Sequence, residues 1–380
     1  MTSPTPLVST FPPPPENKEK LLRSHVLSEL FSDEALGASL SGNLSAQEIL
    51  FQNNIRNLPD ILYINWTEWL ALAMLKDSPI WIKLLFKIRF LFSFFVRYFV
   101  RRALRKFKAG GTKIIYHVHD LHSNWLIPDS PPDQVDQILK YEIFKLCDGL
   151  VIHEPSALDP IKEHHPVPPK VAVCPLGGYD KFHGDAADRI FARTRLGISK
   201  DSLVFFCFGY FQSFRNPSQL VDAFMECCDD NWRLIVAGSN SGTFLDQIKL
   251  NNQIQILDEF IDDPKLRDLF CASDWVIMNG QQHLTSAVAR TAISYSRPVI
   301  CEAYGSQIDM LEGCSIPLAG QSRDDYIHAY LRAADTSPEA CNTLELSAKR
   351  SHDERSWKNF HTQRNRLISD MYLQSQTTPA

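Results

Sequence analysis

Runs of apolar and β-branched residues recur along the chain, and each run is closed by turn-forming or polar residues. Such continuous runs are typical of strands buried on both faces, because a half-exposed strand alternates apolar and polar positions. The first half of the chain holds runs at residues 6–11, 60–65, 112–118, 148–153 and 170–175. The second half holds runs at residues 202–209, 232–238, 254–257, 275–280 and 297–303.

Stretches of helical periodicity lie between these predicted strands. They include residues 134–147, 217–228, 264–272 and 284–296, and a longer helical stretch spans 322–352. Strands that alternate with helices favour parallel sheets with helices on both faces. The sequence therefore predicts the α/β class.

A chain of 380 residues exceeds what one hydrophobic core usually serves, so we expect two domains. The series of strands restarts at Leu203, after a polar segment, which places the boundary near residue 195. We expect a first domain at 1–195, a second at 196–354, and a final helix at 355–375 that packs back on the first. Doubly wound domains bind ligands at the carboxyl ends of their strands, so we expect the site in a cleft between the two.

Composition narrows the range of partners and compartments. The formal net charge of −5 gives no indication of a nucleic-acid partner. The nine cysteines lie mostly in apolar segments and form no CxxC pair, which is typical of reduced core cysteines in the cytoplasm. The N-terminal segment lacks the basic and apolar regions of a signal peptide, so we expect a cytoplasmic protein.

Residues 80–108 hold nine Lys or Arg and no acidic residue. At helical spacing, six of them fall on one stripe: Lys83, Lys87, Arg97, Arg101, Arg105 and Lys108. The longest uncharged run is seven residues, far short of the ~20 that cross a bilayer. Two interpretations stay open: a helix with a solvated basic face, or a surface that also contacts anionic lipid at the inner membrane face.

The segment "KIIYHVHDLHSNW", residues 113–125, places three histidines and an aspartate within six positions. His117 and His119 project from one face of the predicted strand, which with His122 is a basis for a metal site. No later Cys, His or Asp cluster completes such a site, so the sequence predicts no metal. The other interpretation is that His119 and Asp120 mark the point where the strand opens into a ligand cleft.

Six segments carry a resemblance to a known family. They read "DILYINWTEWLALAM", "IIYHVHDLHSNW", "GLVIHEPSA", "VAVCPLGGYDKF", "FFCFGYFQSFRNPSQLVDAF" and, over residues 258–306, a stretch that includes "HLTSAVAR" and "SRPVI". In this order and spacing the chain resembles GT-B glycosyltransferases, more narrowly glycosyltransferase family 4 and related bacterial polysaccharide glycosyltransferases. The resemblance implies a GT-B fold, in which two doubly wound Rossmann-like domains face each other across a cleft.

The resemblance also implies an activity, that of a hexosyltransferase which moves a sugar from a nucleoside-diphosphate-sugar to an acceptor, without metal or another cofactor. Such catalysis depends on positioning and on cations and N–H donors aimed at the departing diphosphate. The family supplies an Arg and, three residues later, a Lys, and these positions correspond to Gln212 and Arg215. Arg215 keeps one cation that can hold phosphate bidentately, whereas Gln212 offers only neutral amide donors. Arg215 as a solvent-facing residue at a helix start is the alternative.

The segment "HLTSAVAR" is expected to begin a helix capped by Thr285 or Ser286, with the N–H groups of its first turn facing an anion. Two glutamates that family 4 usually carries here fall on His283 and Thr291, so the pair is missing. The remaining donor contacts are assigned to glycines at strand ends and to apolar residues of a base pocket: Gly209, Gly238, Phe260 and Ile261. The alternatives are a capped helix without a ligand, turn glycines and core residues.

In the first domain, the resemblance places His119 and Asp120 against the transferred sugar. Asp120, or alternatively Glu154, serves as general base if the reaction inverts the anomeric centre, and a retaining reaction needs none. The acceptor, a glycan or glycolipid that is lipid-linked or a polysaccharide, is expected near Trp66, His122 and Glu154.

Two other functions remain open. Gln212 and the missing glutamates favour a catalytically impaired glycosyltransferase-like protein that binds or regulates a partner. The paired histidines leave a metal-dependent hydrolase as a further alternative.

Overall fold

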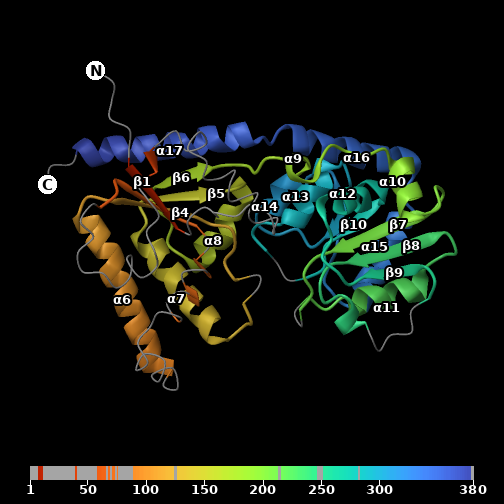
Figure 1. Cartoon of the computed structure of the whole chain (residues 1–380), viewed down its shortest axis with the longest axis horizontal. Helices are drawn as coiled ribbons and strands as arrows, with labels where there is room; N and C mark the ends of the chain where they lie inside the picture. Colours follow the sequence, from red (N-terminus) through yellow and green to blue (C-terminus); the bar gives the residue numbers. More distant parts are fainter. Residues whose placement is uncertain are drawn as a thin grey trace. The chain divides into compact units, whose positions relative to one another are not determined.

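The computed structural model describes residues 7–11, 39–40, 58–65, 67–68, 71–72, 75, 89–123, 126–212, 215–245, 251–280 and 283–377. They fall into two compact units (Figure 1). Unit 1 comprises Met1–Pro175 and Lys358–Ala380, and unit 2 comprises Leu176–Trp357.

Unit 1 is built on a sheet whose strands lie in the order β2-β1-β3-β4-β5-β6 and are all parallel. The strands are β1 (Leu7–Phe11), β2 (Ser39–Leu40), β3 (Ile61–Ile64), β4 (Lys113–His117), β5 (Gly149–Ile152) and β6 (Lys170–Val173). Each residue of β3 and β5 is buried, as expected for strands that are covered on both faces.

Helices cover both faces of this sheet. They are α6 (Arg89–Ala109), α7 (Pro131–Leu146), the short η1 (Pro155–Ala157) and α8 (Leu158–His164), with α17 (Trp357–Thr377) joining from beyond unit 2. In Figure 1, α6 and α7 lie below the sheet of unit 1 and α17 lies above it. Leu367 of α17 packs against Gly149. A Cβ added at Gly149 would lie 3.5 Å from the Leu367 methyl groups.

Unit 2 has a second all-parallel sheet, in the order β12-β11-β10-β7-β8-β9. Read from β9, this is the 3-2-1-4-5-6 order of a Rossmann domain, which reverses between β7 and β10. The strands are β7 (Leu203–Phe208), β8 (Trp232–Ala237), β9 (Ile254–Leu257), β10 (Trp275–Ile277), β11 (Val299–Cys301) and β12 (Ser315–Pro317).

Two apolar cores flank this sheet, which explains the continuous apolar run "LVFFCF" in β7. Val204 and Phe206 join one core, and Phe205 and Cys207 join the other. The helices are α9 (Asp180–His183), α10 (Arg189–Leu196), α11 (Ser218–Cys227), η3 (Gly242–Phe244), α12 (Asp263–Ala272), α13 (Ala287–Ser294), α14 (Ser306–Met310), α15 (Arg323–Ala334) and α16 (Pro338–Asp353). Helices α10, α12 and α13 contribute to the first core, and α11 and α15 to the second.

The predicted α/β class is confirmed, and each of the ten predicted strands is present. The edge strands β2 and β12 were not predicted, because they are two and three residues long and β12 ends in a proline. The predicted helical stretch 322–352 is two helices, since Ser337 caps α16 by accepting a hydrogen bond from the Ala340 N–H. All nine cysteines are free thiols, as predicted.

The chain leaves unit 1 at Pro175, whereas the sequence places the boundary near residue 195. The segment between these positions belongs to unit 2 because α9 and α10 pack against α12. Arg193 of α10 strengthens this contact: its Nε donates to the Ala272 carbonyl at 2.9 Å, and its Nη2 pairs with the Asp274 carboxylate at 2.7 Å.

Arg290 of α13 holds both ends of unit 2, where the chain enters it and where it leaves. This buried side chain donates from Nε to the Gly177 carbonyl at 2.9 Å and from Nη2 to the Arg355 carbonyl at 3.1 Å. The Trp357 indole N–H donates to the Gly178 carbonyl at 3.0 Å. A Cβ at Gly177 would lie 2.3 Å from the Trp357 ring, so only glycine fits there.

Candidate functional site

In unit 2, a small hollow lies where the strand order reverses. The carboxyl ends of β7 and β10 are neighbours there, which is the place where doubly wound sheets bind their ligands. The hollow is lined by Phe208, Gly209, Tyr210, Phe211, Arg215, Met278, Asn279, His283, Ser286 and Val288. Five predicted donor-site residues, namely Gly209, Arg215, His283, Ser286 and Thr285 beside it, therefore come from two distant segments to one edge of the sheet.

Helix α13 begins at this hollow. The Ser286 hydroxyl caps it by accepting a hydrogen bond from the Ala289 N–H at 3.2 Å, so Ser286 and not Thr285 is the cap. The remaining N–H groups of the first turn and the positive end of the helix dipole favour an anion at this position.

Arg215 and His283 close the hollow together. Arg215 Nη2 donates to His283 Nε2, and burial together with the Arg215 charge lowers the pKa of His283 to about 3. Asn279 supports the pair by donating to the Arg215 carbonyl at 3.3 Å. The hollow measures only about 40 Å³ with Arg215 and His283 in contact.

Three glycines at strand ends set the backbone geometry around the hollow. Gly238 has φ +122°, and a Cβ there would lie 1.9 Å from the Gly209 carbonyl oxygen. Gly280 has φ +125°, and a Cβ there would press on the Arg215 side chain at 2.9 Å. A Cβ at Gly209 would meet no atom within 4 Å, so the backbone at the end of β7 faces open space. The absence of a side chain at Gly238 therefore lets the end of β7, at Gly209, pack closely against it. Gly209 is the glycine that a ligand can approach.

The other predicted donor residues lie apart from the hollow or contact it indirectly. Phe260 is 70% exposed, and Ile261 packs into the core, which is the alternative left open for it. The Gln212 carbonyl accepts a hydrogen bond from the Arg215 N–H at 2.8 Å. Thr291 is buried in α13 and its hydroxyl donates to the Ala287 carbonyl at 2.8 Å, so it cannot replace a ribose-binding glutamate.

In unit 1, polar side chains meet at the carboxyl ends of three neighbouring strands. Asn65 follows β3, His117 ends β4 and His153 follows β5. His119 Nε2 donates to Asn65 Oδ1 at 2.6 Å, and His119 Nδ1 lies 3.3 Å from His153 Nε2. His153 Nδ1 donates to the Cys174 carbonyl at 3.2 Å.

Burial keeps His117 and His153 of this cluster in their neutral forms. It lowers the pKa of His153 to about 4, and together with the neighbouring histidines it lowers the pKa of His117 well below its usual value. His117 and His119 are a same-face pair, as the strand period predicts, with ring centroids 4.2 Å apart. The Phe360 ring of α17 packs beside the His117 ring, with ring centroids 5.7 Å apart. The last helix of unit 1 therefore covers one side of the cluster.

The remaining first-domain candidates are placed as follows. Asp120 and Glu154 are buried, each directly after a histidine of the cluster. His122 is exposed and its Nδ1 lies 3.1 Å from Gln137 Nε2, so it does not join His117 and His119 as the sequence suggests. Trp66 lies outside the described residues.

The basic stripe is only partly available to a partner. Arg97 and Arg101 of α6 both pair with the buried Glu142 of α7, and Lys108 pairs with Asp148 at 2.8 Å. Lys83 and Lys87 lie outside the described residues. The aromatic side chains of Phe94 and Tyr98 are more than half exposed on the same helix. None of the helices that the structure describes is long and apolar enough to cross a membrane.

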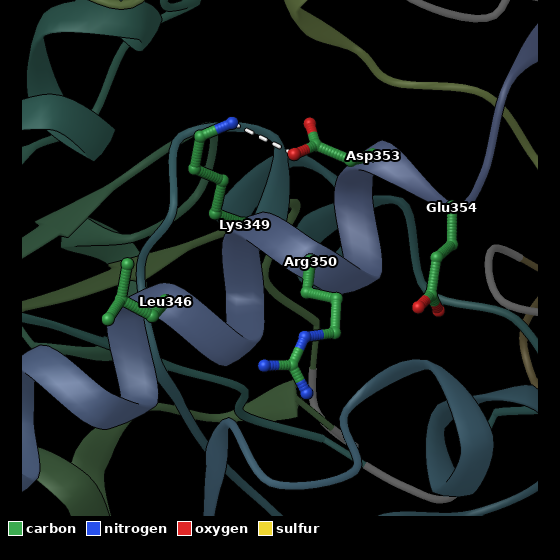
Figure 2. A pocket seen from close by; sticks show the side chains of 5 residues that line it. All are labelled: Leu346, Lys349, Arg350, Asp353 and Glu354. Atoms are coloured by element: carbon green, nitrogen blue, oxygen red, sulfur yellow. Dashed lines mark hydrogen bonds and ion pairs between the residues drawn. The ribbon is translucent and has the colours of Figure 1, made fainter.

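A wider hollow of about 470 Å³ lies along α16 (Figure 2). It is lined by Leu346, Lys349, Arg350, Asp353 and Glu354. Lys349 and Asp353 pair across one helical turn at 2.8 Å (Figure 2). Because these side chains come from one helix and its end, the groove is an ordinary solvated surface and not a site at a strand end.

Sequence reasoning missed five residues that hold the two sites in place. They are Asn65, Asn279, Gly280, Gln321 and Tyr326. The Tyr326 hydroxyl donates to Asn279 Oδ1 at 2.9 Å, and Gln321 Nε2 donates to the Gly280 carbonyl. The dipeptide Asn279-Gly280 directly after β10 was the available signal, because polar and glycine residues at a strand end mark ligand loops in parallel sheets.

Comparison with known proteins gives the fold an identity. No protein-family model matches the chain, and no curated protein matches it in sequence. Solved structures do match. Sucrose-phosphate synthase from Thermosynechococcus elongatus is 14% identical, with a TM-score of 0.61 over 83% of this chain and 74% of that one. HepE from Anabaena, solved in complex with UDP-glucose, is 13% identical, with a TM-score of 0.61 over 82% and 79%.

A glycosyltransferase from Rickettsia africae is 10% identical, with a TM-score of 0.60 over 98% of this chain and 99% of that one. These likenesses, together with the two all-parallel sheets, show the GT-B fold that the resemblance implied. At such low identity they show the fold alone.

Proposed function

We propose that the protein is a glycosyltransferase that transfers a sugar from a nucleoside-diphosphate-sugar to a glycan or glycolipid acceptor. The observation that carries the proposal is the meeting of Arg215 with the capped start of α13, at the point where the strand order of unit 2 reverses. The structural likeness to HepE, whose solved complexes hold UDP-glucose and UDP, supports a uridine donor as the first to test.

In this proposal the diphosphate displaces Arg215 from His283. The Arg215 guanidinium then holds phosphate oxygens bidentately, while N–H groups of the first turn of α13 contact the same anion. Charge that develops on the departing diphosphate meets donors that are already in place, so no metal ion is needed at the diphosphate. His283, neutral and adjacent, donates from its ring to a phosphate or sugar oxygen.

The strand ends of unit 1 supply the groups for the transferred sugar. The His119 ring lies between Asn65 and His153, so its part is to position the segment that it belongs to. Asp120, the next residue, is then the general base if the reaction inverts the anomeric centre, with Glu154 as the alternative.

The acceptor of this proposal is lipid-linked or a polysaccharide, handled by a cytoplasmic protein that associates peripherally with the inner membrane face. The exposed Phe94 and Tyr98, with Arg105 on the same face of α6, fit the interface of an anionic bilayer. Co-sedimentation with vesicles tests this part: pelleting that requires anionic lipid supports it, and no lipid-dependent pelleting contradicts it.

A thermal-shift screen of UDP-, GDP-, ADP- and dTDP-sugars, followed by a transfer assay, tests the main proposal. One donor class should raise the melting temperature, and the Arg215→Ala and His119→Ala variants should lose transfer while keeping the fold. Wild-type transfer rates in both variants would contradict these assignments.

One observation favours a second candidate, a glycosyltransferase-like binding protein without turnover. Gln212 replaces a cation, and the positions of the family's two glutamates hold a histidine paired with Arg215 and a threonine bonded within its own helix. Nucleotide binding without transfer to any acceptor would identify this function.

A further inference from the structure

The three-histidine cluster of unit 1 is a candidate metal site. His117, His119 and His153 each offer a ring nitrogen, and these atoms lie within 4.8 Å of one another. His117 and His153 are only 1% and 3% exposed. The sequence grouped His117 and His119 with His122, but β5 brings His153 to the cluster in its place.

The outer nitrogens of two rings are already bonded to oxygen acceptors. A carbonyl oxygen can only accept, so the bond from His153 Nδ1 to Cys174 places the proton on Nδ1 and a lone pair on Nε2. The bond from His119 Nε2 to the Asn65 amide oxygen likewise leaves a lone pair on Nδ1. Histidine ligands of metals donate their second N–H to such oxygen acceptors in this way.

Two lone pairs therefore face each other 3.3 Å apart, at His119 Nδ1 and His153 Nε2. A zinc–nitrogen bond of about 2.0–2.1 Å and a tetrahedral angle place two nitrogen ligands about 3.3–3.4 Å apart, which matches this separation. Neither ring nitrogen of His117 has a hydrogen-bond partner within the described part of the chain, although both are buried. A buried, unpartnered imidazole beside two converging lone pairs is what a third ligand requires.

We propose that His117, His119 and His153 bind one divalent transition-metal ion of the zinc class at the strand ends of unit 1. Three imidazoles and no carboxylate select such an ion over Mg²⁺ or Ca²⁺, which prefer oxygen ligands. Three protein ligands leave a fourth position for water or a substrate oxygen. The buried Arg364 cation, close enough to His117 to oppose its protonation, works against the ion and limits its affinity.

The rival arrangement holds no metal. If the Asn65 amide is rotated so that its nitrogen donates to His119 Nε2, then His119 Nδ1 carries the proton and donates to His153 Nε2. That chain of hydrogen bonds is complete without a cation, but it leaves His117 without a partner.

Metal binding to the untagged full-length protein distinguishes the two arrangements. After dialysis against a chelator, we expect one equivalent of Zn²⁺ by elemental analysis, and one equivalent of Co²⁺ with the visible absorption of a tetrahedral site. The variants His117→Gln and His153→Gln should each weaken Co²⁺ binding at least about 100-fold. His122→Gln and His164→Gln, at exposed histidines of the same unit, should stay within threefold of wild type. No stoichiometric metal, or equal binding by His153→Gln, would overturn the proposal.

Two further measurements cover variants that fail to fold. Asn65→Ala removes only the acceptor behind His119, and loss of such a partner should weaken metal binding about 10–100-fold. For the wild type alone, micromolar ZnCl₂ should raise the melting temperature and MgCl₂ should not. A melting temperature that does not change with ZnCl₂ favours the rotated amide and rejects the metal site.

Discussion

The two units place different chemistries at the carboxyl ends of their parallel strands. In both, polar residues gather where parallel strands end. Unit 1 presents imidazoles that are buried or half-buried and lie against one another, whereas unit 2 presents the Arg215 cation beside the start of a helix. One edge is therefore suited to neutral hydroxyl chemistry or to a zinc-class ion, and the other to an anion. The strand orders of the two sheets differ, but in both the strands fix only positions, while the residues just after them decide the charge.

The largest expected effect separates chemistry from donor binding. We expect Asp120→Asn to lower kcat about 10²–10⁴-fold, because it removes the proposed base, while the Kd for the nucleoside diphosphate stays within threefold. Steady-state transfer assays and calorimetry measure the two quantities. If Asp120→Asn weakens nucleotide binding as much as it lowers kcat, the division of labour between the units is wrong.

The reverse experiment in unit 2 should weaken binding. Arg215→Ala loses a charge-assisted hydrogen bond that contributes about 1.5–3 kcal/mol, so the Kd for the nucleoside diphosphate should rise roughly 10–150-fold. Calorimetry measures it, with Arg332→Ala, an exposed arginine of α15, as the matched control. An unchanged Kd in Arg215→Ala would move the anion site away from the hollow.

A pair of glycine variants tests the backbone geometry that keeps the hollow of unit 2 open. Gly238→Ala should destabilise unit 2 by about 2–4 kcal/mol, because it combines a positive φ with a clash against the Gly209 carbonyl. Gly209→Ala, which meets no neighbour, should change stability by less than about 1 kcal/mol. Denaturant unfolding of both variants gives the comparison, and equal losses would refute the assigned geometry.

The effect that is smallest at neutral pH concerns His283, because it appears only as the pH falls. The pKa of His283 is about 3 in the folded protein, below the ordinary value of 6.5, so the unfolded chain binds the extra proton first as pH falls. This histidine therefore lowers stability progressively between about pH 6.5 and pH 3, by at most ~1.4 kcal/mol per pH unit. His283→Gln should flatten that part of the melting-temperature profile. A variant whose profile keeps the wild-type slope would mean that His283 is not buried against Arg215.

The sequence predicted the fold more fully than the sites, for a physical reason. The run "LVFFCF" is apolar at every position because both faces of β7 are covered, and that pattern is visible without coordinates. His119 was proposed because it directly follows a predicted strand, and Arg215 because of the family resemblance. The partners Asn65 and His153 come from neighbouring strands 54 and 34 residues away in the chain, and the sequence does not state which strands are neighbours.

The divided make-up of unit 1 has a consequence for synthesis. Residues 358–377 leave the ribosome only after the whole of unit 2, yet Phe360 closes the histidine cluster and Leu367 packs beside Gly149. Domains usually fold in the order in which they are made. Unit 1 is begun first, but its helix α17 is synthesised only after unit 2. Until then, the face of the unit 1 sheet that α17 covers in the folded protein (Figure 1) stays uncovered.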